Sequence, residues 1–176
     1  MSYYYFAASL PSLKIDGALP MSVADFQDMC QAHLAPRHRC AMQALLSDET
    51  EATHPFVRAW RTLDAQIRNA IARYRATKRR IEPATVVRQG IPFEGLAEKA
   101  VTDAFALTDP LQRELAIDRF RWDQLGSLAG FDMFSLESIL AYGLRLKIVE
   151  RWATLSEERG RTRAEDLIEQ RSKSDA

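Results

Sequence analysis

Apolar residues along this chain recur mostly at spacings of three and four, the pattern of helices that bury one face. Alternating apolar and polar runs bounded by hairpin dipeptides are missing, although an extensive sheet would need them. The seven glycines and seven prolines stand mostly between the periodic segments. The pattern therefore predicts an all-α protein, a multi-helix bundle.

Two helices are expected near the amino terminus because each has a recognisable start signal. Ser22 is placed to cap a helix through "SVADFQDMCQAHL", and Asp25 stands where a capping box needs its acidic residue. Pro36 suits the first turn of a second helix, "PRHRCAMQALL". The polar stretch "SDETEATH" that follows is expected to be a loop.

The longest predicted helix begins at Pro55 and runs through "PFVRAWRTLDAQIRNAIARYRATKRRI". Its apolar residues keep spacings of three, four or seven, which places them in one stripe along the helix. The stripe consists of Phe56, Trp60, Leu63, Ile67, Ala70, Ile71, Tyr74 and Ile81. We expect it to pack against the rest of the bundle.

The segment "EPATVVRQGIPFEG", residues 82–95, interrupts the helical pattern with two prolines and two glycines. It is the best internal boundary in a chain whose length, residues 1–176, suggests a single helical domain. "LAEKAVTDAFALT" then presents a face of small residues suited to close helix packing. Thr108 or Asp109 is expected to cap the next helix, "PLQRELAIDRFRWDQLGSLAG", with Pro110 in its first turn.

The last long helix is predicted to follow Ser135 and to run through "LESILAYGLRLKIVERWATLSEER". Its apolar residues occupy more than one face, which is typical of a helix enclosed by its neighbours. Gly160 is expected to end this helix. Thr162 and Glu165 then form a capping box for a final short helix.

The chain opens on an aromatic cluster, "YYYFAASLPSL". It lacks the basic region of a secretory signal, and Pro11 ends its apolar run too early for one. We expect a short first element at residues 3–10, either helix or strand, that ends at Leu10-Pro11. Its tyrosines and Phe6 should anchor this end of the chain in the core, with the hydroxyl groups near solvent.

Composition narrows the setting and the partners. Lysine plus arginine (24) equals aspartate plus glutamate (24), so bulk charge points neither to nucleic acid nor to an acidic surface. No stretch approaches the ~20 apolar residues of a membrane-spanning helix. Two cysteines cannot build a disulfide framework and favour a reducing compartment. We therefore expect a cytoplasmic protein with no direct membrane insertion.

Motifs for nucleotide binding or nucleophilic catalysis are missing from the sequence, which has no Gly-x4-Gly-Lys-Ser/Thr, Gly-x-Gly-x-x-Gly or Gly-x-Ser-x-Gly. Zinc is an alternative at Cys30, His33, His38 and Cys40, because zinc accepts these residue types. We favour the cysteines as small core residues and the histidines at surface or cap positions, since Pro36 divides the two pairs between two helices. No metal or other cofactor is expected.

Paired carboxylates occur at Glu114 and Asp118, one helical turn apart. Asp118 falls on the apolar line of its helix, so we expect it to be partly buried and paired with Arg121 or with an arginine of the long helix. Structural ion pairing is therefore favoured over acid–base catalysis. Three tryptophans on apolar stripes are expected in the core: Trp60, Trp122 and Trp152.

Arginines on the long helix are the strongest charge feature of the sequence. Five of them lie away from the apolar stripe and are the predicted partner-binding residues: Arg58, Arg61, Arg68, Arg75 and Arg79. They would bind an acidic protein partner, or else form a solvated face or pair within the chain. Nucleic acid is disfavoured because Trp60 and Tyr74 lie on the apolar side, where they cannot stack on bases. The residues themselves thus indicate a helical scaffold or interaction protein without enzymatic activity.

Four segments, taken in order, add a resemblance. "YYYFAASLPSL", "SVADFQDMCQAHL", "DPLQRELAIDRFRWDQL" and "LESILAYGLRLKIVERW" resemble a family of uncharacterised proteins encoded within bacterial V-type (V/A-type) ATPase gene clusters. In these clusters the family takes the position otherwise held by the socket protein of the rotor, which links the central stalk to the membrane ring. The similarity covers most of the chain, and its motifs are not catalytic signatures.

The resemblance implies a non-catalytic subunit or assembly component of a V/A-type rotary ATPase. The socket protein of that family of rotors is all-helical, sits on the cytoplasmic face of the membrane rotor ring and receives the central stalk. This shorter chain would form part of such a socket, with rotor ring and central stalk as partners and a location peripheral to the membrane through the complex. The alternative is an independent helical adaptor or regulatory protein that binds an acidic partner.

Overall fold

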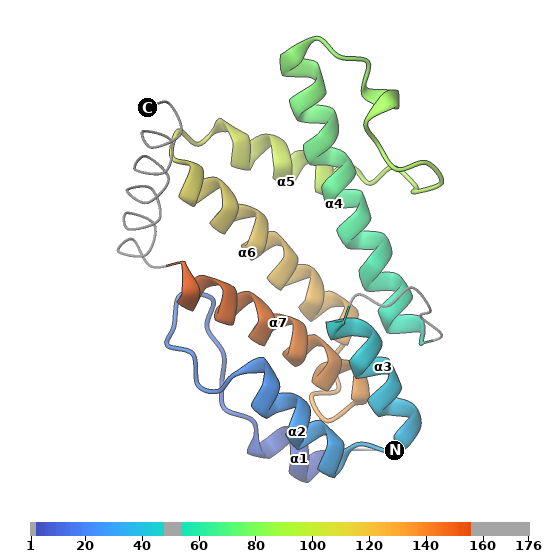
Figure 1. Cartoon of the computed structure of the whole chain (residues 1–176), viewed down its shortest axis with the longest axis vertical. Coiled ribbons are helices and arrows are strands. Elements are labelled where there is room, and N and C mark those ends of the chain that lie inside the picture. Colours follow the sequence, from blue (N-terminus) through green and yellow to red (C-terminus); the bar gives the residue numbers. More distant parts are fainter. Residues whose placement is uncertain (1–2, 48–53, 156–176) are drawn as a thin grey trace, which may run out of the picture.

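The computed structural model describes residues 3–47 and 54–155, and every regular element in these ranges is a helix. Seven α-helices and one short 3-10 helix, η1, make up the described part of the chain (Figure 1). Their bounds are α1 Tyr4–Ser9, α2 Val23–His33, α3 Pro36–Leu46, α4 Pro55–Arg79, η1 Pro83–Thr85, α5 Gly95–Ala106, α6 Pro110–Ala129 and α7 Leu136–Thr154. The prediction of an all-α, multi-helix bundle is confirmed.

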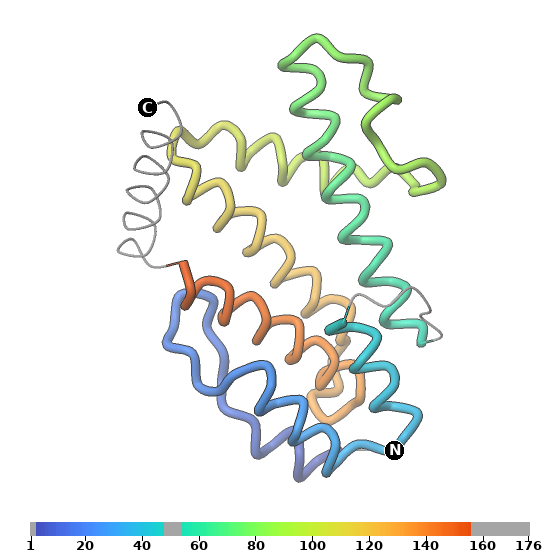
Figure 2. Tube along the Cα trace, in the orientation of Figure 1, coloured from blue at the N-terminus to red at the C-terminus, as the bar shows by residue number. Residues whose placement is uncertain are grey.

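Helices α6 and α7 run antiparallel, side by side, through the middle of the molecule (Figures 1 and 2). Helices α2 and α3 pack against α7, whereas α4 and α5 pack against α6. The carboxyl-terminal end of α4 projects beyond α5 at one end of the long axis (Figure 2). The described helices therefore form two groups that meet along α6 and α7. Within the described residues no helix combines the length and the apolar character that crossing a bilayer requires.

The larger hydrophobic core surrounds α7. Its most deeply buried large side chains come from α2, α3, α6 and α7, and they are Phe26, Met42, Leu125, Ile139, Leu140 and Leu146. Nine residues of α7 are buried, and they lie on more than one face of the helix. The expectation that this helix is enclosed by its neighbours is confirmed.

Gly143 lies where α7 passes close to side chains of α2 and α3. A Cβ atom at this position would lie 2.9 Å from Cε1 of Phe26 and 3.0 Å from Sδ of Met42. Both side chains are almost fully buried, so they have no open space into which to move. The missing side chain at Gly143 therefore sets the spacing between these helices.

The smaller hydrophobic core lies among α4, α5 and α6. Its buried residues are Leu63, Ile67, Ala70, Ala97, Val101, Ala104 and Ile117. The α5 residues of this set are alanines and a valine, spaced three and four apart, and each is about 1% exposed. The predicted small-residue face is thus confirmed as a close-packing surface.

The segment 82–95 is attached to the smaller core by a buried asparagine. Asn69 of α4 donates from Nδ2 to the carbonyl oxygen of Arg88 (3.0 Å) and accepts the Arg88 N–H at Oδ1 (2.8 Å). The segment connects α4 to α5, two helices that pack against each other. The division of the chain at this segment stays a prediction.

Helix starts follow the expected side-chain signals. Ser22 and Asp25 form the capping box of α2, with Ser22 Oγ accepting the Asp25 N–H at 3.0 Å. Pro36 occupies the first turn of α3. Asp109, rather than Thr108, caps α6 by accepting the N–H of Leu111.

Two helix ends differ from the sequence prediction. Helix α7 ends at Thr154 and not at residue 159; Thr154 Oγ1 donates to the carbonyl of Arg151, and the N–H of Leu155 donates to that of Trp152, which closes the last turn. The predicted signals at Gly160 and at Thr162–Glu165, and most of the expected loop "SDETEATH", lie outside the described residues.

Helix α4 ends before the last residue of its predicted apolar stripe. Arg80 adopts a left-handed conformation (φ 57°), which turns the chain after Arg79. Ile81 therefore lies outside the helix and is exposed, so its assignment to the stripe was wrong. The remaining stripe residues are buried or half-buried.

The aromatic opening forms helix α1, which resolves the choice between helix and strand. Phe6 and Tyr3 are buried, whereas Tyr4 and Tyr5 are exposed, so only part of the cluster anchors the chain. The Tyr3 hydroxyl lies 2.5 Å from Nδ1 of His38 and accepts the N–H of Ala35 at 3.3 Å. The expectation that the tyrosine hydroxyls face solvent is therefore wrong for Tyr3, because the start of α3 offers it partners.

Candidate functional site

The predicted partner-binding arginines lie along α4, outside its buried stripe. Four are exposed, namely Arg58, Arg68, Arg75 and Arg79, and Arg61 is half-buried. Arg61, Arg68 and Arg75 are seven residues apart and therefore share one side of the helix, with Arg79 one turn further on. We call these five residues the arginine strip.

Part of the arginine strip interacts within the chain. Arg61 donates from Nη2 to the carbonyl of Ala44 at the end of α3 (2.7 Å). Arg68 Nε lies 2.7 Å from Asp64 Oδ2 on the same helix. The guanidinium of Arg75 lies over the ring of Phe105 on α5, 5.7 Å from its centre. The alternative of internal pairing thus holds for part of the strip.

The projecting end of α4 concentrates exposed cations. Arg75, Lys78, Arg79 and Arg80 are exposed there, over the last turns of the helix and its carboxyl cap. Cations at this end also interact favourably with the partial negative charge of the helix carboxyl terminus. This end of α4 is the most basic part of the arginine strip and its immediate neighbours.

Arg73 was not among the predicted residues, although it joins two helices. Its Nε donates to Oε1 of Glu98 on α5 at 2.7 Å, and its guanidinium lies 5.4 Å from the ring centre of the exposed Phe93. Arg73 stands away from the heptad line of the arginine strip, and its partner is 25 residues distant. No local pattern in the sequence indicates that pair.

A buried carboxylate, Asp118, holds α6 to its neighbours. Its side chain is 3% exposed, and Oδ1 accepts Nη1 of Arg121 at 2.9 Å. Oδ2 accepts the indole N–H of Trp152 at 2.8 Å and also pairs with Arg151, both on α7. Arg121 extends the network to Asp64 of α4, with Nη2 at 3.2 Å from Oδ1. The prediction of a buried, cation-paired Asp118 is confirmed.

The source of the second cation was predicted incorrectly. The long helix contributes the carboxylate of Asp64, and α7 supplies Arg151, which also lies 3.8 Å from Glu114. The reason is the antiparallel packing of α6 on α7, which brings residues more than thirty positions apart into contact. Both members of the carboxylate pair, Glu114 and Asp118, thus belong to ion pairs.

The three tryptophans pack where they were expected, although each is only half-buried. Trp60, Trp122 and Trp152 all contact the larger core, and Trp60 also contacts the smaller one. Trp152 in addition carries the hydrogen bond to Asp118, because a partly buried indole N–H needs an acceptor.

The cysteines and histidines of the zinc alternative do not converge. Cys30 is buried in the larger core, where burial raises the pKa of its thiol to about 12, but Cys40 is exposed. The core interpretation is therefore right for Cys30 and wrong for Cys40. His33 stacks on Phe6, and His38 contacts Tyr3. Across residues 3–47 and 54–155, no group of three or more His, Cys, Asp or Glu residues is arranged to hold a metal ion.

Exposed apolar residues form a second surface that the sequence reasoning missed. Phe131 and Met133, in the turn between α6 and α7, are fully exposed and 72% exposed, and Tyr5 of α1 is 89% exposed. The backbone N–H of Tyr3 donates to the carbonyl of Phe134, which holds α1 beside this turn. An available signal was the apolar run "GFDMF" in a position without helical periodicity. We call Tyr5, Phe131 and Met133 the aromatic end.

Comparison with known proteins gives a match over the later part of the chain. A family model described as "Protein of unknown function (DUF2764)" is similar to residues 92–174, a range that includes α5, α6 and α7. No curated protein and no solved structure matches the chain.

Proposed function

We propose that this protein is a non-catalytic subunit or assembly component of a V/A-type rotary ATPase that helps to couple the central stalk to the membrane rotor ring. The observation that carries the proposal is the basic, projecting end of α4, which offers a rigid docking surface to an acidic subunit. The ordered resemblance of its segments to the ATPase-cluster family supports the choice of complex. The protein would then be cytoplasmic and peripheral to the membrane through its partners.

The way α4 is anchored supports a load-bearing role. Phe56 and Val57 at its start lie in the larger core, and Ile67 and Ala70 lie in the smaller one. The Asp64–Arg121–Asp118 network fixes α4 to α6 between these points. A helix held at several places resists bending, so a partner bound at its end is connected mechanically to the whole bundle.

Two ends with different chemistry support a connector rather than a single-partner protein. The basic end of α4 and the aromatic end lie apart along the long axis of the molecule (Figure 1). Charge complementarity favours correct orientation and partner choice, whereas exposed aromatic and Met side chains are typical of the desolvated centre of an interface. One protein could therefore contact two different neighbours at once.

Charge reversal tests the basic docking surface. We expect the double variant Arg75→Glu/Arg79→Glu to lose co-purification with rotor complexes while circular dichroism shows unchanged helicity. A matched control, Lys14→Glu/Arg119→Glu, makes the same charge change at two exposed cations elsewhere and should remain bound. Equal recovery of both variants would contradict the docking surface.

The identity of the recovered proteins separates the proposal from its alternative. A pull-down from native membranes with the tagged full chain should recover rotor-ring and central-stalk subunits. Recovery of a different acidic protein, lost in the Arg75→Glu/Arg79→Glu variant, would instead favour an independent helical adaptor.

A further inference from the structure

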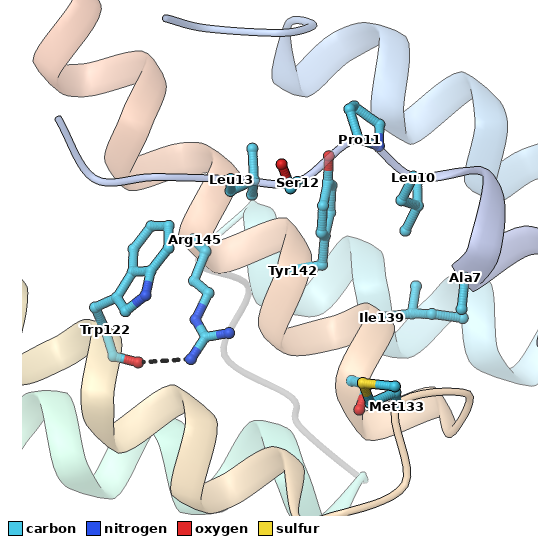
Figure 3. Close-up of a pocket in the computed structure, with 11 residues that line it drawn as sticks. Ala7, Leu10, Pro11, Ser12, Leu13, Trp122, Met133, Ile139, Tyr142 and Arg145 are labelled. Carbon is cyan, nitrogen blue, oxygen red and sulfur yellow. Dashed lines mark hydrogen bonds between the residues drawn. The ribbon is translucent and has the colours of Figure 1, made fainter. Parts of the chain in front are cut away.

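A cavity of about 230 Å³ lies between α1 with the segment that follows it and the paired helices α6 and α7. Figure 3 shows the side chains of Arg145 and Tyr142 from α7 beside Trp122 of α6, with Leu10 and Leu13 across the opening. Neither the arginine strip nor the Asp118 network takes part in this cavity. It is therefore a separate feature from the proposed docking surface.

Two polar atoms buried at this cavity have no hydrogen-bond partner among the described residues. They are the hydroxyl oxygen of Tyr142 and Nε of Arg145. Leaving buried polar groups unpaired is costly, so proteins rarely do so without a functional reason. Burial raises the pKa of the Tyr142 hydroxyl to about 12, which keeps it protonated and able to donate.

Arg145 is held in place without an ion pair. Its Nη2 donates to the carbonyl of Trp122 at 3.0 Å, and its guanidinium lies over the Trp122 ring, 5.0 Å from the centre. Among the described residues no carboxylate forms an ion pair with it, unlike Arg73, Arg121 and Arg151. Burial lowers the pKa of Arg145, an effect that the more distant Asp123 partly offsets. An anion in the cavity would stabilise its charge.

Gly126 of α6 provides the space that the guanidinium occupies. A Cβ atom at Gly126 would lie 2.8 Å from Nη2 of Arg145. An alanine there would therefore push the end of the arginine side chain away from its present position. This contact offers a way to move the cation without removing it.

The remaining wall of the cavity is mostly apolar. Leu10, Leu13, Ile139 and Met133 line it together with the Trp122 ring. A volume of about 230 Å³ equals that of roughly eight water molecules in the liquid and lies below the ~300–1,000 Å³ of drug-sized pockets. The occupant that fits is thus small, with one polar end and an apolar body.

We propose that this cavity binds a small organic carboxylate, whose carboxylate group pairs with Arg145 and accepts the Tyr142 hydroxyl while its apolar body contacts Trp122, Leu10 and Ile139. Arginine suits this ligand because its planar group of donors matches a carboxylate. The inference stands on the cavity and does not depend on the proposed ATPase role.

Titration of the purified full chain with benzoate and hexanoate, followed by backbone NMR, tests the proposal. We expect saturable shifts for residues 10–13 and 139–145 at ligand concentrations up to about 10 mM, which lies above a ~1 mM affinity. Benzamide, the neutral analogue of benzoate, should bind at least about tenfold more weakly, because hydrogen bonds to charged groups are the stronger ones. Equal binding of benzoate and benzamide, or no saturable binding of either carboxylate, would overturn the proposal.

Variants assign the binding to the cavity. Arg145→Gln should weaken benzoate binding at least about tenfold without changing benzamide binding, and Tyr142→Phe should weaken it a few-fold. Arg119→Gln, an exposed arginine of α6, is the matched control and should bind like the parent. If Arg145→Gln does not fold, Gly126→Ala displaces the same guanidinium and should also weaken benzoate binding. Parent-like benzoate affinity in the folded variant would refute the site.

Discussion

The two hydrophobic cores of this protein are stabilised in different ways. The larger core buries large aromatic and aliphatic side chains around α7, whereas the smaller core brings α4, α5 and α6 together on several small residues. Small side chains bury little apolar area, and hydrophobic stabilisation scales with that area. The smaller core therefore depends more on directed polar contacts, namely Asn69 with Arg88 and Arg73 with Glu98. Bulk holds one half of the bundle, and hydrogen bonds and ion pairs hold much of the other.

Removing the carboxylate of Asp118 should break the connection between the two cores and have the largest effect. Asp118→Ala leaves the buried Arg121 and the Trp152 indole N–H without their partner, and breaking a buried pair costs about 3–5 kcal/mol. Urea unfolding measures this loss. Asp123→Ala, on the exposed side of α6, should change stability by no more than about 0.5 kcal/mol. Similar stability of both variants would contradict the role given to Asp118.

Matched cavities compare the cores directly. Ile139 and Ile67 are both fully buried, one in each core, so Ile139→Ala and Ile67→Ala remove the same atoms. Each should cost about 2–5 kcal/mol, with Ile139→Ala the larger because α7 is enclosed and cannot move to fill the space. Calorimetric unfolding of both variants checks the order. A greater loss for Ile67→Ala would reverse our account of the cores.

Each core also has a polar clamp that can be removed singly. Asn69→Ala leaves the Arg88 N–H and carbonyl without their partner, at a cost of about 1–3 kcal/mol, and should speed hydrogen exchange at the Arg88 amide. Tyr3→Phe keeps the buried ring but removes the hydroxyl that contacts His38 and Ala35, at a cost of about 1 kcal/mol. Unchanged exchange at Arg88 in the Asn69 variant would show that the clamp is dispensable.

Acidification should weaken the larger core slightly, through His38. Burial and then the nearby Arg37 lower the pKa of His38 below its ordinary value of 6.5. The unfolded chain therefore binds this proton more tightly, so the stabilisation is present above pH 6.5 and is lost as the pH falls through the folded value. Thermal unfolding between about pH 8 and about pH 5 should show a fall that His38→Gln reduces. The same slope in both proteins would exclude His38 as the cause.

Local features of the fold could be predicted from the sequence, and the long-range contacts could not. Ser22, Pro36, Asp109 and Ser135 mark helix starts because a cap acts within one turn of its own residue. The burial of Asp118 was predictable for the same reason, since it follows from the periodicity of one helix. Its contacts with Arg151 and Trp152 depend on how α6 packs against α7, and periodicity within one helix contains no such information.

The candidate surfaces divide along the same line. The arginine strip could be located because its residues share a helical period, whereas the inward turn of Arg61 required the position of Ala44 on another helix. The cavity at Arg145 was not predicted, because it is formed by three segments that are distant in sequence. A lone arginine on an apolar helix gives no sign that its partner is missing.

The close contact at Gly143 has a consequence for mutational tolerance. Within a helix, glycine is normally about 1 kcal/mol less favourable than alanine, so a stability scan would nominate Gly143→Ala as an improvement. Here the added Cβ would press on Phe26 and Met42, which have no room to move, so the sign of the effect reverses. In saturation mutagenesis of α7, position 143 should reject every replacement, alanine included, while the exposed Ala153 accepts most. The residue that helix propensity would replace first is thus one that packing does not allow to change.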